Sequence, residues 1–220
     1  MFWRWEPVES MLEREASLVA IIPMKPLANS KTRLAHRFSP GQRAGLVMGM
    51  LCRVISAIQS ASISKLWVVG GDQQIRDMTQ KFGGLWLEEL GCNLNDTLGK
   101  AFDRAFQRDA SALYLAGDLP FLKPSDLHSL MQASRRRQNI TLAPARREGG
   151  TNAMLLPPGV AFRPQLGPSS FTKHLSQAAA LEISVAICSS PGLGLDLDTT
   201  EDLEIYEHME PGFLERLAAG

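Results

Sequence analysis

The sequence has no excess of either charge, few cysteines and no long apolar run, and each shortage argues against a class of protein. Its 220 residues include 23 Lys and Arg and 23 Asp and Glu, so the net charge at neutral pH is zero. Without a basic excess, nothing general points to a nucleic acid or an anionic membrane as partner, and any anion site must be local. No segment approaches the ~18 apolar residues of a transmembrane helix, so we expect no membrane span.

Cysteine usage points to a reducing compartment. Cys52, Cys92 and Cys188 lie far apart and form no CxxC pair, so they provide no framework for a metal. The segment MFWRWEPVESMLEREAS, residues 1–17, is charged throughout and has no continuous apolar core, unlike a secretory signal peptide. We therefore predict a cytoplasmic protein.

Residues 1–17 are nevertheless unusual for a polar arm, because Phe2, Trp3 and Trp5 are aromatic. Two interpretations are open. The arm packs on its own domain, or it docks on a second copy of the chain in a homodimer. We treat it as an N-terminal arm, and residues 18–220 as one domain, since a chain with 45% hydrophobic residues can bury one sizeable core.

Strands alternate with helices along this domain. Strands are predicted in SLVAIIPM, KLWVVGGD, SALYLAGDLP, NITLAPA, NAMLLPP and EISVAIC, and helices from residue 40, around 98–106, from 124, near 170–180 and in TTEDLEIYEHM. Asn95 is the expected cap of the second helix, and Thr199 or Thr200 that of the last, with Asp202 as a first-turn acid. The alternation predicts a three-layer α/β domain with a mostly parallel sheet, whose ligands lie beyond the carboxyl ends of the strands.

A cluster of cations follows the first strand. In VAIIPMKPLANSKTRLA, residues 19–35, the cations Lys25, Lys31 and Arg33 have little nearby in the sequence to neutralise them. The loop is not a P-loop, because Ala, Asn and Ser stand where glycines must let bare backbone approach phosphates. We therefore expect side-chain cations, rather than a glycine nest, to neutralise a polyanion here.

Carboxylates are expected at the same edge of the sheet. Asp118 follows Gly117 at a strand end, and Asp196 and Asp198 alternate, so that in an extended segment both point to one side. Three such carboxylates repel one another unless a cation lies among them, and oxygen-only ligands favour Mg²⁺ or Mn²⁺. A hard divalent ion beside a basic loop is what a nucleoside triphosphate requires.

Five motifs occur in an order that resembles the 2-phospho-L-lactate guanylyltransferase family of coenzyme F-420 biosynthesis: PMKPLANSKTRL, GDLPFL, GGTNAMLLPP, LGPSSFTKH and LDLDTTEDL. The resemblance covers residues 18–208. It implies a GT-A-like nucleotidyltransferase fold that transfers GMP from GTP, with Mg²⁺, to 2-phospho-L-lactate, phosphoenolpyruvate or 3-phospho-D-glycerate and releases pyrophosphate.

The resemblance also implies roles for individual residues. Catalysis would depend on Lys31, Arg33 and Asp118, with the nucleotide bound by Lys25, Lys31, Arg33 and Asn95. The metal would be held by Asp118 and Asp196, assisted by Asp198. The phospho-acid would meet Thr151, Gly167 and Ser170, with Asn152, Ser169 and His174 close by. Cys92 departs from the family pattern, and we hypothesise that Cys92 and Ser169 leave space for a substrate hydroxyl, admitting 3-phosphoglycerate.

Elementary chemistry agrees with a phosphate nucleophile. A phosphate monoester has a second pKa of about 6, so it attacks as an anion and needs no strong general base. It does need cancellation of the repulsion between two polyanions, which a metal and a basic loop supply. The glycines and short polar side chains of GGTN, and the helix start at Ser169 and Ser170, suit a second anionic substrate.

Two other functions are open from the sequence. A GT-A glycosyltransferase could use Asp196-Leu197-Asp198 as its DxD motif, although such enzymes expel no pyrophosphate and have no need of the SKTR cluster. A non-catalytic nucleotide-sensing subunit could present the aromatic arm to a partner. No residue is recognisable as the one that reads guanine.

Overall fold

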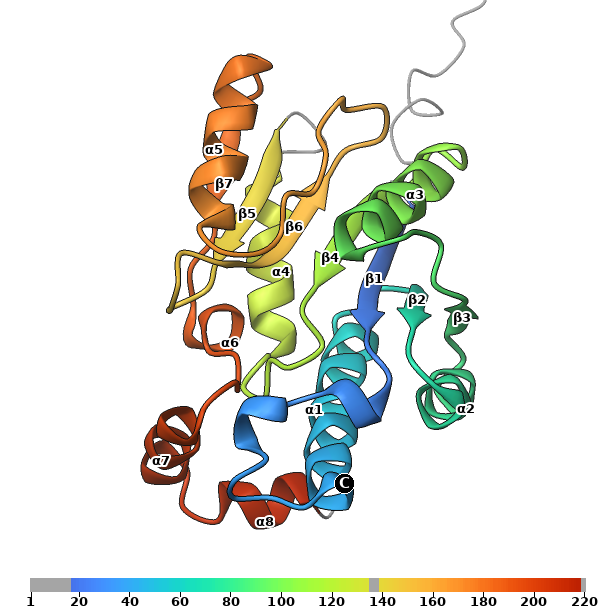
Figure 1. Ribbon diagram of the computed structural model, residues 1–220. Helices are drawn as coiled ribbons and strands as arrows, with labels where there is room; N and C mark the ends of the chain where they lie inside the picture. Colours follow the sequence, from blue (N-terminus) through green and yellow to red (C-terminus); the bar gives the residue numbers. More distant parts are fainter. Residues whose placement is uncertain (1–16, 135–138, 219–220) are drawn as a thin grey trace, which may run out of the picture.

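The computed structural model describes residues 17–134 and 139–218, which form one α/β domain (Figure 1). The arm predicted over residues 1–17 lies outside the described residues, except for residue 17. None of the helices in the described ranges is long and apolar enough to cross a membrane.

A seven-stranded sheet forms the middle layer, in the order β3-β2-β1-β4-β6-β5-β7. Its strands are β1 (Leu18–Met24), β2 (Lys65–Gly70), β3 (Leu85–Leu87), β4 (Ser111–Leu115), β5 (Ile140–Pro144), β6 (Thr151–Leu156) and β7 (Val185–Ile187). Only β6 among these runs antiparallel to its neighbours, so the mostly parallel mixed sheet is confirmed. The short β5–β6 connection explains the exception, because a tight turn can join only antiparallel strands.

Helices cover both faces of the sheet (Figure 1). They are α1 (Pro40–Ser60), α2 (Gln73–Lys81), α3 (Leu94–Phe106), α4 (Pro124–Ala133), α5 (Ser170–Ala180), α6 (Pro191–Gly194), α7 (Thr200–Met209) and α8 (Phe213–Ala218). Alternate residues of β1 enter two separate cores. Ala20 and Ile22 pack in the core on the α1 and α4 side, while Val19 and Ile21 pack in the core on the α3 side. The three-layer prediction is therefore confirmed.

Local signals fix where several helices begin. Ser39 accepts the backbone N–H of Gln42 in a capping box at α1, and Thr199 does the same for Asp202 at α7. The predicted Asn95 cap was wrong by two residues. Asn93 accepts the N–H of Asp96 and caps α3, which places Asn95 inside the first turn.

Candidate active site

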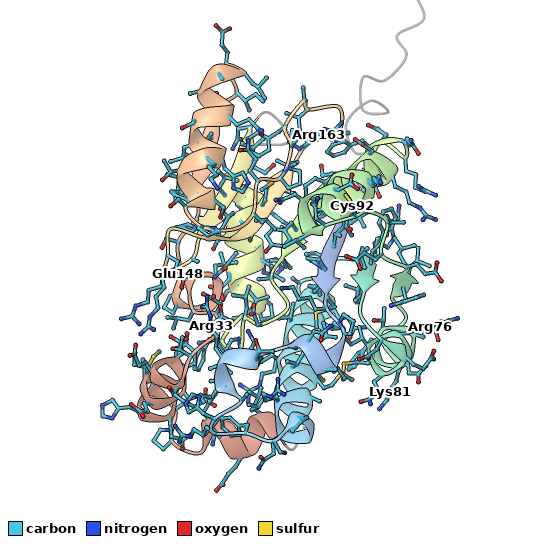
Figure 2. All side chains as sticks on the ribbon, viewed as in Figure 1. Arg33, Arg76, Lys81, Cys92, Glu148 and Arg163 are labelled. Atoms are coloured by element: carbon cyan, nitrogen blue, oxygen red, sulfur yellow. The ribbon has the colours of Figure 1, made fainter. Side chains whose placement is uncertain are left out.

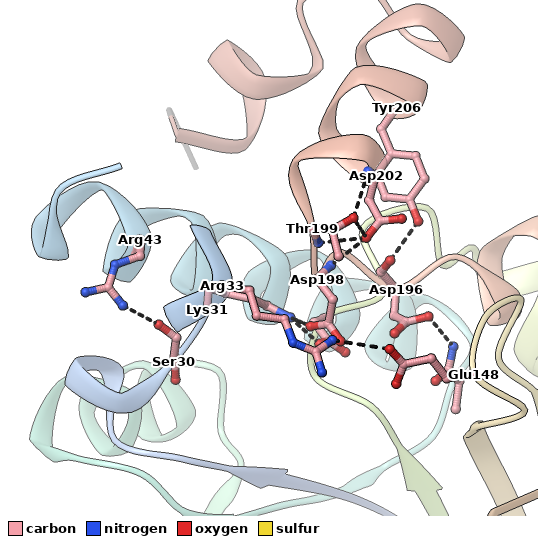
Figure 3. A network of polar contacts seen from close by, with 12 residues as sticks. Ser30, Lys31, Arg33, Arg43, Glu148, Asp196, Asp198, Thr199, Asp202 and Tyr206 are labelled. Carbon is pink, nitrogen blue, oxygen red and sulfur yellow. Dashed lines mark hydrogen bonds and ion pairs between the residues drawn. The ribbon is translucent and has the colours of Figure 1, made fainter. Parts of the chain in front are cut away.

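The loop after β1 brings Lys31 between two aspartates (Figure 3). Two short 3-10 turns, Leu27–Asn29 and Thr32–Leu34, shape this loop, and Lys31 between them has a left-handed backbone, φ 49°. Its ammonium forms ion pairs with Asp118 and, at 2.7 Å, with Asp198. Lys31 is thus neutralised within the protein, by carboxylates 87 and 167 residues away in the sequence and not by neighbours in the loop.

The ion pairs fix the charge states of these groups. Burial lowers the pKa of the Lys31 ammonium, but Asp118 and Asp198 raise it by more, so the net pKa is raised and Lys31 stays charged. Burial acts to raise the pKa of the Asp198 carboxyl, but Lys31 outweighs this effect and the net pKa is lowered. Lys31 has only 8% of its side chain exposed, against 46% for Asp198. The lysine is thus the buried centre of the cluster.

Asp196 belongs to the same end of the sheet and has a different environment. Its carboxylate accepts a hydrogen bond from Asn152 at 3.2 Å, and its backbone carbonyl accepts one from the Tyr206 hydroxyl at 2.7 Å. Burial, followed by repulsion from Asp118, raises the pKa of Asp196. Asp118 therefore has two charged neighbours: it is attracted by the ammonium of Lys31 and repelled by the carboxylate of Asp196.

Asp202 stabilises the backbone of the segment that carries Asp196 and Asp198. One oxygen of Asp202 accepts the backbone N–H groups of Asp198 and Thr199, at 3.0 and 2.8 Å. Its other oxygen pairs with Arg147 at 3.3 Å. The sequence reading of Asp202 as a first-turn acid was correct, but it missed this second contact to the backbone of Asp198 (Figure 3).

Arg33 points across to the β5–β6 turn. Its guanidinium lies 3.4 Å from the carboxylate of Glu148, and both side chains are more than half exposed (Figure 2). Such an exposed pair is weak, so Arg33 remains available to an anionic ligand.

Two cavities meet at this cluster. The first, about 480 Å³, is lined by the basic loop with Lys25, Lys31 and Arg33, by Asp118 and by the ends of β2 and β3. The second, about 270 Å³, is lined by the β5–β6 turn, the start of β6, the start of α5 with the residues before it, and the segment before α7; its lining includes Thr151, Asn152, Gly167, Ser170 and Asp196. Arg33, Leu94, Tyr114 and Asp198 line both cavities, so the two spaces adjoin.

The wall of the second cavity is a hydrogen-bonded group around Thr151. The backbone N–H of Gln165 donates to Nε2 of His174, so that nitrogen carries no proton and Nδ1 donates to the Thr151 hydroxyl at 2.9 Å. The Ser170 hydroxyl also donates to Thr151, at 3.3 Å. Thr151 thus accepts two bonds, and its own O–H donates to none of the residues that the structure describes.

His174 is a structural residue in this group. It is fully buried, and burial, with a smaller contribution from Lys173, lowers its pKa to about 4. Both ring nitrogens are engaged within the protein, so His174 positions Thr151 and has no free nitrogen to act as a base.

Three predicted site residues line neither of these cavities. Asn95 accepts the N–H and donates to the C=O of Leu166, and so ties α3 to the segment before α5. Cys92 and Ser169 are exposed, Cys92 in the loop before α3 (Figure 2) and Ser169 at the start of α5. Sequence reasoning missed Arg147 and Glu148, although the string PARREGGTN places them directly before the predicted acid-binding residues.

A divalent cation fits the chemistry of the donors at this cluster. No group of three or more His, Cys, Asp and Glu within the described ranges is arranged as a metal site. Asp118 and Asp198 are both engaged by Lys31. Burial, and then repulsion from Asp118, raise the pKa of Asp196, and a hard cation between these two carboxylates would relieve that repulsion. Asp118 and Asp196 are therefore the donors that suit such an ion.

The fold and this site together define a nucleotidyltransferase. The model of the family described as "Guanylyl transferase CofC like" matches residues 18–212, and the chain belongs to that family. It is accordingly a guanylyltransferase.

Curated relatives carry three substrate names. The chain is 35% identical to a phosphoenolpyruvate guanylyltransferase of Rubrobacter xylanophilus, over 87% of this chain and 94% of the relative. It is 33% identical to a 2-phospho-L-lactate guanylyltransferase of Methanothermobacter thermautotrophicus, over 87% and 85%. It is 32% identical to a 3-phospho-D-glycerate guanylyltransferase of Phenylobacterium zucineum, over 83% and 86%.

Solved structures share the fold at low sequence identity. A Desulfovibrio desulfuricans protein assigned as a nucleotide-diphospho-sugar transferase has a TM-score of 0.76 and 13% identity, over 93% of this chain and 95% of that one. A nucleotidyl transferase of Methanothermobacter thermautotrophicus has a TM-score of 0.57 and 14% identity, over 90% and 98%. These similarities support the predicted nucleotidyltransferase fold.

Proposed function

We propose that the chain transfers GMP from GTP to the phosphate of 2-phospho-L-lactate, phosphoenolpyruvate or 3-phospho-D-glycerate, in the cytoplasm and as a step of coenzyme F-420 biosynthesis. The observation that carries the proposal is the meeting of the two cavities at Arg33 and Asp198, beside the buried Lys31. The first cavity would hold the nucleotide, and the second the phospho-acid.

In this reaction a phosphate oxygen of the acid forms a bond to the α-phosphorus of GTP, and the bond from that phosphorus to the β-phosphate bridging oxygen breaks. Pyrophosphate leaves with the electron pair. The nucleophile is already anionic at neutral pH, so no base is needed, and the hydrogen-bonded His174 supplies none. What the site must supply is positive charge, and Lys25, Lys31 and Arg33 line the nucleotide cavity.

Lys31 has the best position among these cations. It is buried, held by two carboxylates and permanently charged, so its charge is fixed before any nucleotide enters. Thr151 offers its hydroxyl hydrogen in the second cavity, where it can bind an anionic oxygen of the acid. Mg²⁺ held by Asp118 and Asp196 would offset negative charge on the phosphates of the nucleotide.

The test is product formation from GTP and Mg²⁺ with each of the three acids. Pyrophosphate release and mass spectrometry should reveal a GMP-capped acid for at least one of them. Asp118→Asn should lower the rate by about 10²–10³-fold, as expected when a charged group at a reacting phosphate is lost. Asp77→Asn, on the outer surface of α2, is the matched control and should keep the wild-type rate.

Two outcomes would overturn the proposal. Release of a nucleoside diphosphate from a sugar nucleotide, with no pyrophosphate from GTP, would establish a glycosyltransferase. Binding of GTP without turnover of any acid, in wild type and Asp118→Asn alike, would establish a non-catalytic nucleotide-binding subunit.

A further inference from the structure

The nucleotide cavity has a second end, away from the Lys31 cluster. It extends past the carboxyl ends of β1 and β2 to Glu89, which follows β3, and its lining there includes Val69 and Thr97. Asp118 follows β4, and three strand spacings separate β4 from β3. At roughly 4.8 Å a spacing, the two ends lie on the order of 14 Å apart. With a triphosphate at the Lys31 end, ribose and base would extend toward Glu89.

Glu89 is a free acceptor at this end. Its carboxylate forms no hydrogen bond or ion pair with any of the residues that the structure describes, although nearby carboxylates such as Asp72 and Asp96 are engaged. Glu88 and Glu89 are both exposed, but only Glu89 is part of the cavity lining. One of two adjacent glutamates is therefore presented to the cavity.

Gly70, at the end of β2, lies close to Glu89. Gly70 ends β2 with φ 79°, and a Cβ there would lie 2.7 Å from the carbonyl oxygen of Met24 and 4.0 Å from Cβ of Glu89. Only glycine fits this conformation, because a side chain at this position would collide with the backbone of β1. The indole N–H of Trp86 donates to the Gly70 carbonyl at 2.9 Å, and Arg76 lies over that indole at 5.1 Å, so the end of β2 beside Glu89 is held in place.

A second polar group at this end also has no partner. Thr97 of α3 lines the cavity and is 3% exposed, and its hydroxyl forms no hydrogen bond with the described part of the chain. Buried hydroxyls are normally satisfied, so an orphan at a cavity wall points to a missing polar ligand.

We infer that Glu89 reads the guanine base, an inference that rests on the proposed use of GTP. The Watson–Crick edge of guanine presents two adjacent donors, the ring N1–H and the 2-amino group. A carboxylate has only acceptors and can take both donors in charge-assisted bonds. Adenine presents an unprotonated N1 at the same place, which would face the carboxylate acceptor to acceptor. Glu89 thereby selects GTP over ATP.

Glu89→Gln tests this inference by inverting one contact. The glutamine amide still accepts from N1–H, but its NH₂ opposes the 2-amino group of guanine. Xanthine carries a carbonyl at that position, so the same amide can donate to it. We expect the variant to bind GTP roughly 10–100-fold more weakly, the discrimination of a bidentate base contact, and to bind XTP more tightly than wild type does.

The measurement is displacement of a ribose-labelled fluorescent GTP by GTP, XTP and ATP, followed by pyrophosphate release with each. Glu88→Gln is the matched control and should keep the wild-type order of nucleotides. Unchanged GTP binding by Glu89→Gln, or equal losses for GTP and XTP in a variant that melts like wild type, would overturn the inference. Failure of the proposed function would look different: wild type would bind GTP but release no pyrophosphate with any of the three acids.

Discussion

The neutral His174 should make the stability of the protein depend on pH in a defined window. The ordinary pKa of histidine is 6.5, and burial lowers that of His174 to about 4. Between these pH values His174 binds a proton in the unfolded chain but not in the folded chain. The free energy of unfolding therefore keeps this contribution above pH 6.5 and loses it as the pH falls toward 4. A difference of about 2.5 pKa units corresponds to about 3 kcal/mol in all, of which about 2 kcal/mol is lost by pH 5.

The assay is urea denaturation of wild type and His174→Gln at pH 7 and pH 5. The variant loses stability at pH 7, because the bonds to Thr151 and Gln165 are disturbed. The decisive quantity is how this loss changes with pH. Since the variant lacks the titrating ring, its deficit should shrink by about 2 kcal/mol at pH 5.

Subtracting the free energy of unfolding of the variant from that of wild type at each pH cancels the contributions of all other titrating groups. His128→Gln, an exposed position on α4, is the control and should follow wild type at both pH values. A deficit of His174→Gln that is equal at pH 7 and pH 5 would refute the reasoning, because it would mean that His174 takes up its proton equally in the folded and unfolded chains.

Two further predictions concern the charged cluster of the site and the contact between α1 and α8. Lys31→Met leaves Asp118 and Asp198 without their buried cation, so the free energy of unfolding should fall by about 2–4 kcal/mol. Adding Asp198→Asn should restore part of this loss in thermal melts, and a Lys31→Met melting temperature equal to that of wild type would contradict the prediction. Gly49→Ala places a Cβ 2.1 Å from the carbonyl oxygen of Leu217, so it should release α8 to limited proteolysis, whereas Gly45→Ala in the same helix meets nothing within 4 Å and should be neutral or stabilising by about 0.5–1 kcal/mol.

The parts of the fold that the sequence predicts are those with local causes. The β-branched run of β1 indicates burial on both faces, and its alternate residues do enter two cores. Ser39 and Thr199 are followed three residues later by Gln42 and Asp202, the spacing of a capping box. Asn93 and Asn95 are both good caps, and only the path of the chain before α3 decides between them.

The contacts that define the site have no local cause. Lys31 reaches its carboxylates because its backbone is left-handed and because β1 and β4 are neighbours in the sheet. Neither fact can be read from SKTR. The same holds for Cys92 and Ser169, since the direction in which an exposed loop turns its side chains depends on the elements that surround it.

The charges of the described cluster explain why a basic loop alone cannot be enough for catalysis. Three carboxylates, Asp118, Asp196 and Asp198, lie at this cluster with one buried cation, Lys31, and the exposed Arg33 is only weakly paired with Glu148. A triphosphate brought to this cluster without a counter-ion would add its negative charge to an excess of carboxylates. Lys25 and Arg33 add positive charge at the same cavity, but both are exposed, so solvent and salt screen part of it. The excess of acid beside Lys31 is therefore the strongest physical reason to expect that the nucleotide enters together with a divalent cation.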